Sequence, residues 1–277
     1  MYIEYFGLDE FPFSITPDTS FTYLSKGHQE ALNTLLLAIE SGEGFIKVTG
    51  EVGTGKTLLC RRLINALSNE VQLAYLPNPY MGPQTLMLAL AEELGLGDDI
   101  PTDEYHVLKA INQALLQFAA AEKQVVVLID EAQAMPVETL EALRLLSNME
   151  TEKQKLLQII LIGQPELDVK LSDQSVRQLR QRIAFNYRIP TLSTEETRAY
   201  LEHRLRVAGY RSTPIFDAKA LKAMHQSSRG TPRLLNILAH KSLLAAFGEG
   251  TKHVSVRHVR LAANDTPGST HVGWWLR

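Results

Sequence analysis

The sequence has few cysteines, no excess of positive charge and no long apolar run. Cys60 is the single cysteine among 277 residues, which excludes an internal disulfide. The formal net charge of −3 provides no overall positive field for nucleic acid or anionic lipid, although a local basic face stays open. No uninterrupted apolar run approaches the roughly 20 residues that are needed to span a bilayer. These features are typical of an ordinary globular protein.

The first residues, MYIEYFGLDEFPF, have neither the basic start nor the long apolar stretch of a signal peptide. We therefore expect a cytoplasmic protein. Cys60 falls on the apolar side of an expected helix, where a small core residue is a better interpretation than a redox centre. With 45% apolar residues, the chain has enough apolar material for one large domain or two modest ones.

Apolar runs and helical periodicity alternate between residues 29 and 189. The strand-like apolar runs occupy residues 45–48, 71–76, 125–129 and 156–162. Residues 185–189 alternate apolar with polar side chains, which predicts a last, more exposed strand. The helical stretches occupy residues 29–41, 56–67, 83–94 and 105–121. Because continuous apolar runs suit strands that are covered on both faces, this order predicts an α/β fold, a parallel sheet sandwiched by helices.

After Leu192 the apolar periodicity is purely helical. The helical stretches are residues 195–208, 217–226, 232–246 and 255–263. Ser193 and Glu196 form a possible capping box. Thr231 followed by Pro232 resembles an N-cap residue followed by proline at the first helical position. We expect four parts. Residues 1–24 form an aromatic-rich extended arm that packs on the α/β core, and residues 25–191 form that α/β domain. Residues 192–265 form an all-helical lid, and residues 266–277 form a tail.

The segment VTGEVGTGKT follows an expected strand and opens an expected helix. Its G-x-x-x-x-G-K-T spacing predicts a phosphate loop, in which glycines let backbone N–H groups turn toward the phosphates of ATP. Lys56 is expected to reach the β- and γ-phosphates, and Thr57 to supply a hydroxyl to Mg²⁺. A chance glycine turn is the alternative. The predicted nucleotide-binding residues are Gly50, Glu51, Val52, Gly53, Thr54, Gly55, Lys56, Thr57 and Leu58.

A second acidic motif, VVVLIDEAQ, ends an apolar run with Asp130 and Glu131. The carboxyl ends of parallel strands are where ligands bind in such folds. Asp130 suits a magnesium ion, and Glu131 can polarise the water that attacks the γ-phosphate. An exposed acidic turn is the alternative, but the pairing with the phosphate loop favours the catalytic interpretation.

Gln164 follows the apolar run LLQIILIG, directly before Pro165. A polar residue at that strand tip could orient the attacking water or contact the γ-phosphate. A hydrogen bond to the neighbouring turn is the simpler alternative.

Two groups of arginines are further candidates. Arg177, Arg180 and Arg182 precede the last expected strand and form either a solvated face or an arginine finger for a neighbouring subunit. Arg233 stands in the first turn of an expected lid helix, where a cation is mildly unfavourable unless it faces an anion such as the γ-phosphate. A simple ion pair is the alternative for Arg233. The histidines show no metal-ligand spacing.

Together these motifs resemble the AAA+ P-loop ATPases and, more narrowly, the ExeA/GspA family of secretion ATPases. The matching segments are YFGLDEFPFSITPD, GEVGTGKT, DEAQ, IGQPEL, LRQRI and GTPRLLNILAHKSLLAAF, so the resemblance runs from about Tyr2 to about Asn264. It implies Gln164 and Arg233 as first and second sensors, Arg182 as the preferred finger with Arg180 second, and an arm whose residues 15–23 border the adenine. Gln at the first sensor departs from the Asn, Ser or Thr that is common in AAA+ proteins.

The resemblance also implies a role at the bacterial inner membrane. Members of this family assist assembly of type II secretion or type IV pilus machinery, and long members continue into a transmembrane segment and a peptidoglycan-binding domain. We expect here the short, ATPase-only form, similar to members that serve mannose-sensitive haemagglutinin pili. The expected partners are other copies of the chain, in an ATP-dependent homo-oligomer, and an inner-membrane assembly protein. Peripheral association of the chain with the membrane is a further possibility.

Three function classes fit the motifs. An ATP-driven assembly factor is favoured over a DNA-handling ATPase, such as a transposition helper or helicase loader, and over a slowly hydrolysing nucleotide switch. DNA binding would require many phosphate-neutralising lysines or arginines and would depend steeply on salt. The tail residues Trp274 and Trp275 either contact a membrane-protein partner or pack back on the lid.

Overall fold

The computed structural model describes residues 2–16, 19–97, 103–150 and 155–270. It divides into two compact units. The α/β unit comprises His28–Gly50 and Lys56–Ile189, and the helical unit comprises Met1–Gly27, Glu51–Gly55 and Pro190–Arg277. Trp274 and Trp275 lie outside the described residues.

The α/β unit is built on a parallel five-stranded sheet with the order β2-β3-β4-β1-β5. The strands are β1 (Phe45–Thr49), β2 (Val71–Leu76), β3 (Gln124–Ile129), β4 (Gln158–Gly163) and β5 (Ile183–Arg188). This arrangement confirms the predicted α/β class. The phosphate-loop strand β1 and the acidic strand β3 both adjoin β4, so the chemistry-bearing strand ends converge around β4.

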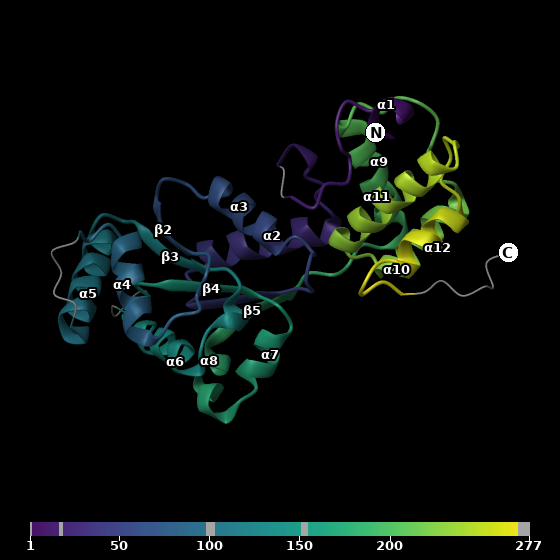
Figure 1. Ribbon diagram of the computed structural model, residues 1–277. Coiled ribbons are helices and arrows are strands. Elements are labelled where there is room, and N and C mark those ends of the chain that lie inside the picture. The colour runs from purple at the N-terminus through teal and green to yellow at the C-terminus, as the bar shows by residue number, and fades with distance from the viewer. Residues whose placement is uncertain (1, 17–18, 98–102, 151–154, 271–277) are drawn as a thin grey trace. The chain divides into compact units, whose positions relative to one another are not determined.

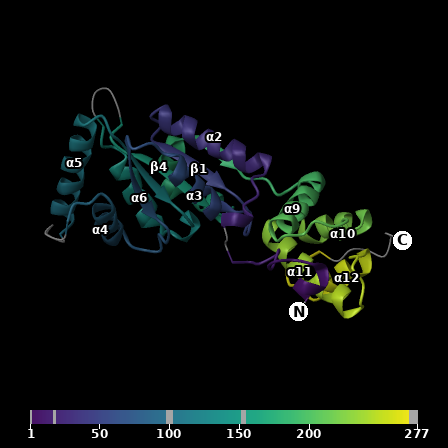
Figure 2. The same ribbon diagram turned by 90° about the horizontal axis from the view of Figure 1, so that it is seen from above.

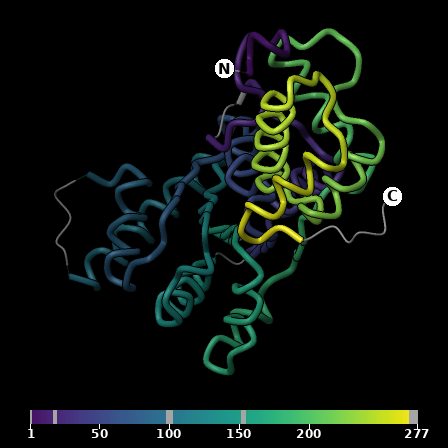
Figure 3. Tube along the Cα trace, turned by 45° about the vertical axis from the view of Figure 1, so that its right-hand side comes forward, coloured from purple at the N-terminus to yellow at the C-terminus, as the bar shows by residue number. Residues whose placement is uncertain are grey.

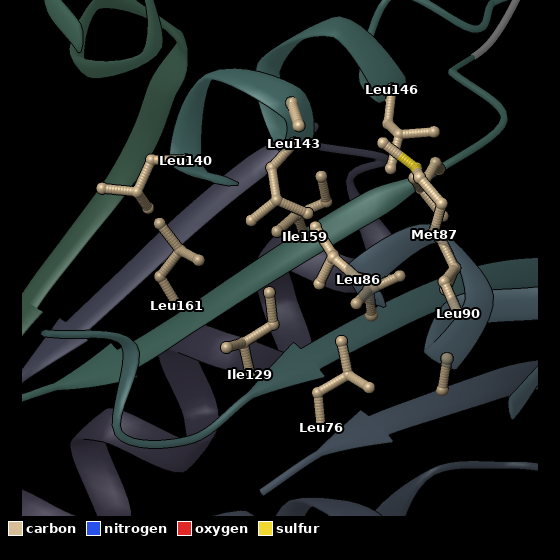
Figure 4. Packing of buried hydrophobic residues seen from close by; sticks show 14 of the residues in the cluster. Leu76, Leu86, Met87, Leu90, Ile129, Leu140, Leu143, Leu146, Ile159 and Leu161 are labelled. Carbon is tan, nitrogen blue, oxygen red and sulfur yellow. The ribbon is translucent and has the colours of Figure 1, made fainter. Parts of the chain in front are cut away.

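Alternate residues of the central strands pack into two different cores. In β3, Val125, Val127 and Ile129 face one core, whereas Val126 and Leu128 face the other. Since successive strand residues point to opposite faces, a continuous apolar run is what a strand covered on both sides requires. The first core lies between the sheet and helices α4 and α6, where leucines interdigitate with strand residues (Figure 4).

Helices cover both faces of this sheet (Figure 1). On one face lie α2 (Lys26–Glu40) and α3 (Lys56–Ala66). On the other face lie α4 (Pro83–Glu93), α5 (Glu104–Ala120), α6 (Val137–Leu146), α7 (Glu166–Leu171) and α8 (Arg177–Arg182). The 3-10 turns η2 (Ala132–Ala134) and η3 (Gln174–Val176) connect them.

Four helices of the helical unit pack around one apolar core. They lie together at one end of the view in Figure 2. They are α9 (Thr194–Val207), α10 (Ala218–Ser228), α11 (Pro232–Gly248) and α12 (Val256–Asn264). The predicted capping box is present, because the Ser193 hydroxyl accepts from the Glu196 N–H while the Glu196 carboxylate accepts from the Ser193 N–H. Thr231 is the N-cap of α11, with Pro232 next, but the Thr231 side chain makes no capping hydrogen bond.

The N-terminal arm differs from its prediction in two ways. It begins with a short helix, α1 (Tyr2–Phe6), and a 3-10 turn, η1 (Thr19–Phe21), follows. Its aromatic side chains belong to the core of the helical unit, and not to the α/β core on which the arm was expected to pack. The purple trace of the arm runs beside the helices of the helical unit (Figure 3). Buried Arg204 anchors the arm, because its guanidinium donates to the Pro12 carbonyl at 2.5 Å and lies 4.8 Å from the Phe21 ring centroid.

Candidate nucleotide site

The phosphate loop leaves the sheet at Gly50, whose N–H donates to the Gly163 carbonyl of β4 at 3.1 Å. At the other end of the loop, Lys56 is only 5% exposed, and its ammonium donates to the Gly50 carbonyl at 3.0 Å. A buried ammonium is costly without partners, so the loop carbonyl holds the charge beside the start of α3. This arrangement places the predicted phosphate-binding lysine at a helix N-terminus, where the backbone also favours anions.

The predicted metal-binding pair is brought together. The Thr57 hydroxyl donates to Oδ2 of Asp130 at 2.8 Å, and Asp130 is 2% exposed at the end of β3. Hydroxyl and carboxylate oxygens are ligands that Mg²⁺ prefers. The two side chains therefore fit a magnesium ion, which would bring Lewis-acid stabilisation of the phosphate charge.

Cys60 lies one turn along α3 from these residues and is fully buried. Burial raises the pKa of the Cys60 thiol far above its usual range, and the nearby Asp130 carboxylate adds to this effect. A thiol that stays protonated is a poor nucleophile and a poor metal ligand. The environment of Cys60 therefore supports the prediction that it is a small core residue and not a redox centre.

The predicted catalytic carboxylate of Glu131 directly follows Asp130 in the chain. Its backbone is left-handed, with φ 52°, and its N–H donates to Oδ1 of Asp130 at 2.8 Å. The Glu131 Oε2 atom accepts from Nε2 of Gln164 at 3.1 Å, so the acid and the predicted first sensor meet. Gln133 donates to the same oxygen.

Sequence reasoning missed Gln133. Its Oε1 accepts from the backbone N–H of Gln164 at 2.9 Å, which connects η2 with the tip of β4. A second missed group is Lys170 on α7, which donates to the backbone carbonyl of Gln133 at 2.6 Å. Gln133 stands in the quoted DEAQ segment, but nothing local in the sequence indicates its contact with Gln164.

Another part of the phosphate loop belongs to the helical unit. Gly53 and Gly55 both have positive φ, 79° and 94°. The N–H of Arg233, at the start of α11, donates to the Gly53 carbonyl at 3.3 Å. A Cβ on Gly53 would lie 2.4 Å from the Arg233 Cβ, so the close approach requires glycine. The predicted second sensor thus lies beside the tip of the loop.

The candidate finger arginines have different surroundings. Arg182 donates through Nη1 to the Ser147 hydroxyl at 2.6 Å and to the Arg144 carbonyl at 3.2 Å. Arg180 is exposed on α8, and its side chain has no hydrogen-bond or ion-pair partner among the described residues. The geometry therefore favours Arg180 over Arg182 as the guanidinium that is free to contact another molecule.

Comparison with known proteins first defines the class. Residues 39–171 match the family model described as an AAA domain. The structure is similar to the ORC2 protein of Aeropyrum pernix, with TM-score 0.64, 18% identity, and coverage of 95% of this chain and 73% of that chain. It is also similar to the RuvB Holliday junction branch migration motor of Thermotoga maritima, with TM-score 0.56, 16% identity, and coverage of 92% and 73%. The fold is that of the AAA+ P-loop ATPases.

A sequence relative narrows the class. The chain is 42% identical over 275 residues to the general secretion pathway protein A of Aeromonas hydrophila. This match covers 99% of the chain and 50% of the relative, so the chain spans about half the length of that protein. The predicted resemblance to the ExeA/GspA family is confirmed. Among the described residues, no helix is long and apolar enough to cross a membrane.

Proposed function

We propose that the chain binds Mg-ATP and hydrolyses it to ADP and phosphate. The observation that carries this proposal is the convergence around β4 of a magnesium-type oxygen pair, Thr57 and Asp130, with the amide-held carboxylate of Glu131. Phosphoryl transfer depends mainly on positioning and charge stabilisation, and these groups supply both. The fold of the AAA+ ATPases and the AAA-domain match support the same reaction class.

Each predicted residue has a role in this proposal. Lys56 and the backbone N–H groups of residues 50–58 hold the phosphates, and Thr57 with Asp130 holds the metal ion. Glu131 accepts a proton from the attacking water, and Gln164 orients that water. Arg233 contacts the γ-phosphate as the second sensor.

We also propose a finger in trans. Arg180 completes the site of a neighbouring copy, because its guanidinium is exposed while that of Arg182 is bound to α6. Arginine suits this role because its charge is permanent and its planar fork matches phosphate oxygens. The proposal requires an ATP-dependent homo-oligomer.

The biological role that we propose is assembly of an envelope machine at the cytoplasmic face of the bacterial inner membrane. Similarity to a protein named for general secretion supports a type II secretion apparatus. The motifs also resemble the pilus biogenesis protein MshM, which supports a type IV pilus. An inner-membrane assembly protein is the expected partner in both cases.

Titration calorimetry with Mg-ATP tests the nucleotide site. The wild-type chain is expected to bind, and Lys56→Ala is expected to weaken binding about ten- to 100-fold, because a charge-assisted contact is worth about 1.5–3 kcal/mol. Glu131→Gln is expected to bind normally but to release no phosphate. Absence of any heat with the wild-type chain would refute the proposal.

A salt-titrated DNA-binding assay separates the assembly factor from a DNA-handling ATPase. Two of the solved structures that share this fold were determined with DNA, but at identities of 18% and 16% the likeness extends only to the fold. We expect no DNA binding at physiological salt. Binding whose affinity falls steeply with salt would favour the DNA-handling alternative.

A further inference from the structure

Gln133 joins groups from two neighbouring strand ends. It lies in η2, two residues after Glu131, and its Nε2 donates to Oε2 of Glu131. Its Oε1 accepts from the backbone N–H of Gln164 at 2.9 Å. Because the Gln164 side chain donates to the same Glu131 oxygen at 3.1 Å, the three residues form a closed hydrogen-bonded unit. We call it the glutamine bridge.

The surroundings hold Gln133 in this position. The Lys170 ammonium donates to the Gln133 carbonyl at 2.6 Å and to the buried Met135 carbonyl, which fixes η2 against α7. A Cβ on Gly163 would lie 2.9 Å from the Gln133 Oε1 and 3.2 Å from its backbone nitrogen. A glycine at the end of β4 is therefore what allows the Gln133 side chain to reach Gln164.

The bridge acts on a residue with an unusual backbone. Glu131 has φ 52° and ψ 36°, a left-handed conformation that is uncommon for residues other than glycine. Such a conformation persists only where the surrounding structure determines it. Here the Glu131 N–H is held by Asp130, and Oε2 is held by two amides. The described residues donate no hydrogen bond to Oε1, which leaves that oxygen for a water molecule.

We propose that Gln133 is a positioning residue, whose side-chain amide aims the Glu131 carboxylate at the attacking water and ties its position to the tip of β4. This inference rests on the proposed ATPase activity and adds a residue to it. Proton transfer from water requires the accepting oxygen within hydrogen-bond distance and correctly oriented, and a misplacement of about 1 Å can cost about 100-fold in rate. Holding Oε2 orients Oε1.

The test compares three variants in a phosphate-release assay with Mg-ATP. Gln133→Leu keeps the side-chain size but removes the amide, and it is expected to lower kcat about ten- to 100-fold. Gln133→Glu keeps an oxygen for the Gln164 N–H but sets a second carboxylate against Glu131, and it is expected to lower kcat at least as much. Gln113→Leu, on the exposed face of α5, is the matched control and is expected to leave kcat unchanged.

A positioning role of Gln133 is distinguished from a structural role by its effect on ATP binding. The ATP dissociation constant of Gln133→Leu, measured by calorimetry, is expected to stay close to that of the wild-type chain. An unchanged kcat would overturn the inference, as would a raised kcat, which would mean that the bridge restrains the carboxylate. Equal weakening of kcat and ATP binding would also overturn it.

A second measurement keeps the inference separate from the ATPase proposal. In the nucleotide-free protein, denaturant unfolding of Gln133→Leu, Glu131→Leu and the double variant forms a double-mutant cycle. Residues that share a hydrogen bond are expected to show non-additive costs. Additive costs would overturn the bridge even if the wild-type chain hydrolyses ATP. A wild-type chain that hydrolyses no ATP would refute the proposed function whatever the cycle shows.

Discussion

At the scale of single residues, Gly53 has two separate requirements for glycine. Its φ of 79° is unfavourable for any side chain, and a Cβ would meet Arg233 at 2.4 Å. Gly42 has a similar φ of 72° with nothing within 4 Å of a Cβ, so it is a matched control. We expect Gly42→Ala to cost about 1 kcal/mol from backbone strain alone, and Gly53→Ala to cost more because Arg233 must move. Thermal unfolding of both variants measures the difference, and equal costs would contradict the close contact.

His240 provides a pH prediction at the same scale. Burial lowers the pKa of His240, whose Nδ1 lies 2.9 Å from the hydroxyl oxygen of the fully buried Tyr2. The unfolded chain then takes up a proton at higher pH than the folded one, with an ordinary value of about 6.5. The stabilisation is complete above that pH and is lost as the pH falls toward the lower folded pKa. We expect the melting temperature to fall between pH 7 and 5.5, with a smaller fall in His240→Asn. An equal fall in both proteins would assign the effect elsewhere.

At the scale of elements, the start of α9 depends on a reciprocal cap. Ser193 and Glu196 satisfy each other's backbone N–H groups, and Glu196 also accepts from the backbone N–H of Lys26 at 3.1 Å. Loss of a capping oxygen typically costs about 1 kcal/mol. Ser193→Ala is expected to lower the unfolding free energy by about that amount, whereas Ser193→Thr keeps the oxygen and is expected to stay close to wild type. Denaturant unfolding distinguishes them, and a matching loss in Ser193→Thr would show that the cap is unimportant.

Another element-level feature is α7, which holds two parts of the α/β unit together. Asp168 on this helix pairs with buried Lys47 of β1, while Lys170 holds the carbonyls after β3. Because α7 begins two residues after Gln164, the helix ties the strand tip to both neighbouring strands. Both ends of the glutamine bridge, at η2 and at the tip of β4, are therefore held in place by α7.

At the scale of the whole molecule, ATP-dependent association is the central prediction. Glu131→Gln is expected to bind ATP without turnover and so to accumulate as an oligomer, which light scattering after size exclusion detects. Glu131→Gln with Arg180→Ala tests the finger, because loss of a guanidinium from a neighbour's site is expected to weaken the assembly. Arg182→Ala is the comparison. If Arg182→Ala alone weakened association, Arg182 would be the finger, and a monomer in ATP would count against both.

From the sequence by itself we predicted the parallel sheet, which the structure confirms, and a candidate phosphate loop and acidic pair. These are local signals, because buried parallel strands require continuous apolar runs and phosphate loops require glycines at set spacings. Residues 71–76 were predicted with the bounds that β2 has. Helix α1 was not predicted, because residues 1–24 were expected to form an extended arm. Pro12 and Pro17 disfavour a regular helix, but both lie after the end of α1 at Phe6.

Tertiary structure alone decided which side chains meet across long separations. The contact of Gln133 with Gln164, the binding of Arg182 by Ser147 and the packing of the arm into the helical unit join residues that are far apart in the chain. Composition and periodicity describe which face a residue occupies, but not which partner stands opposite. The physical reason is that such pairs are selected by the packing of the whole fold, which brings strand ends together only after the sheet order is set.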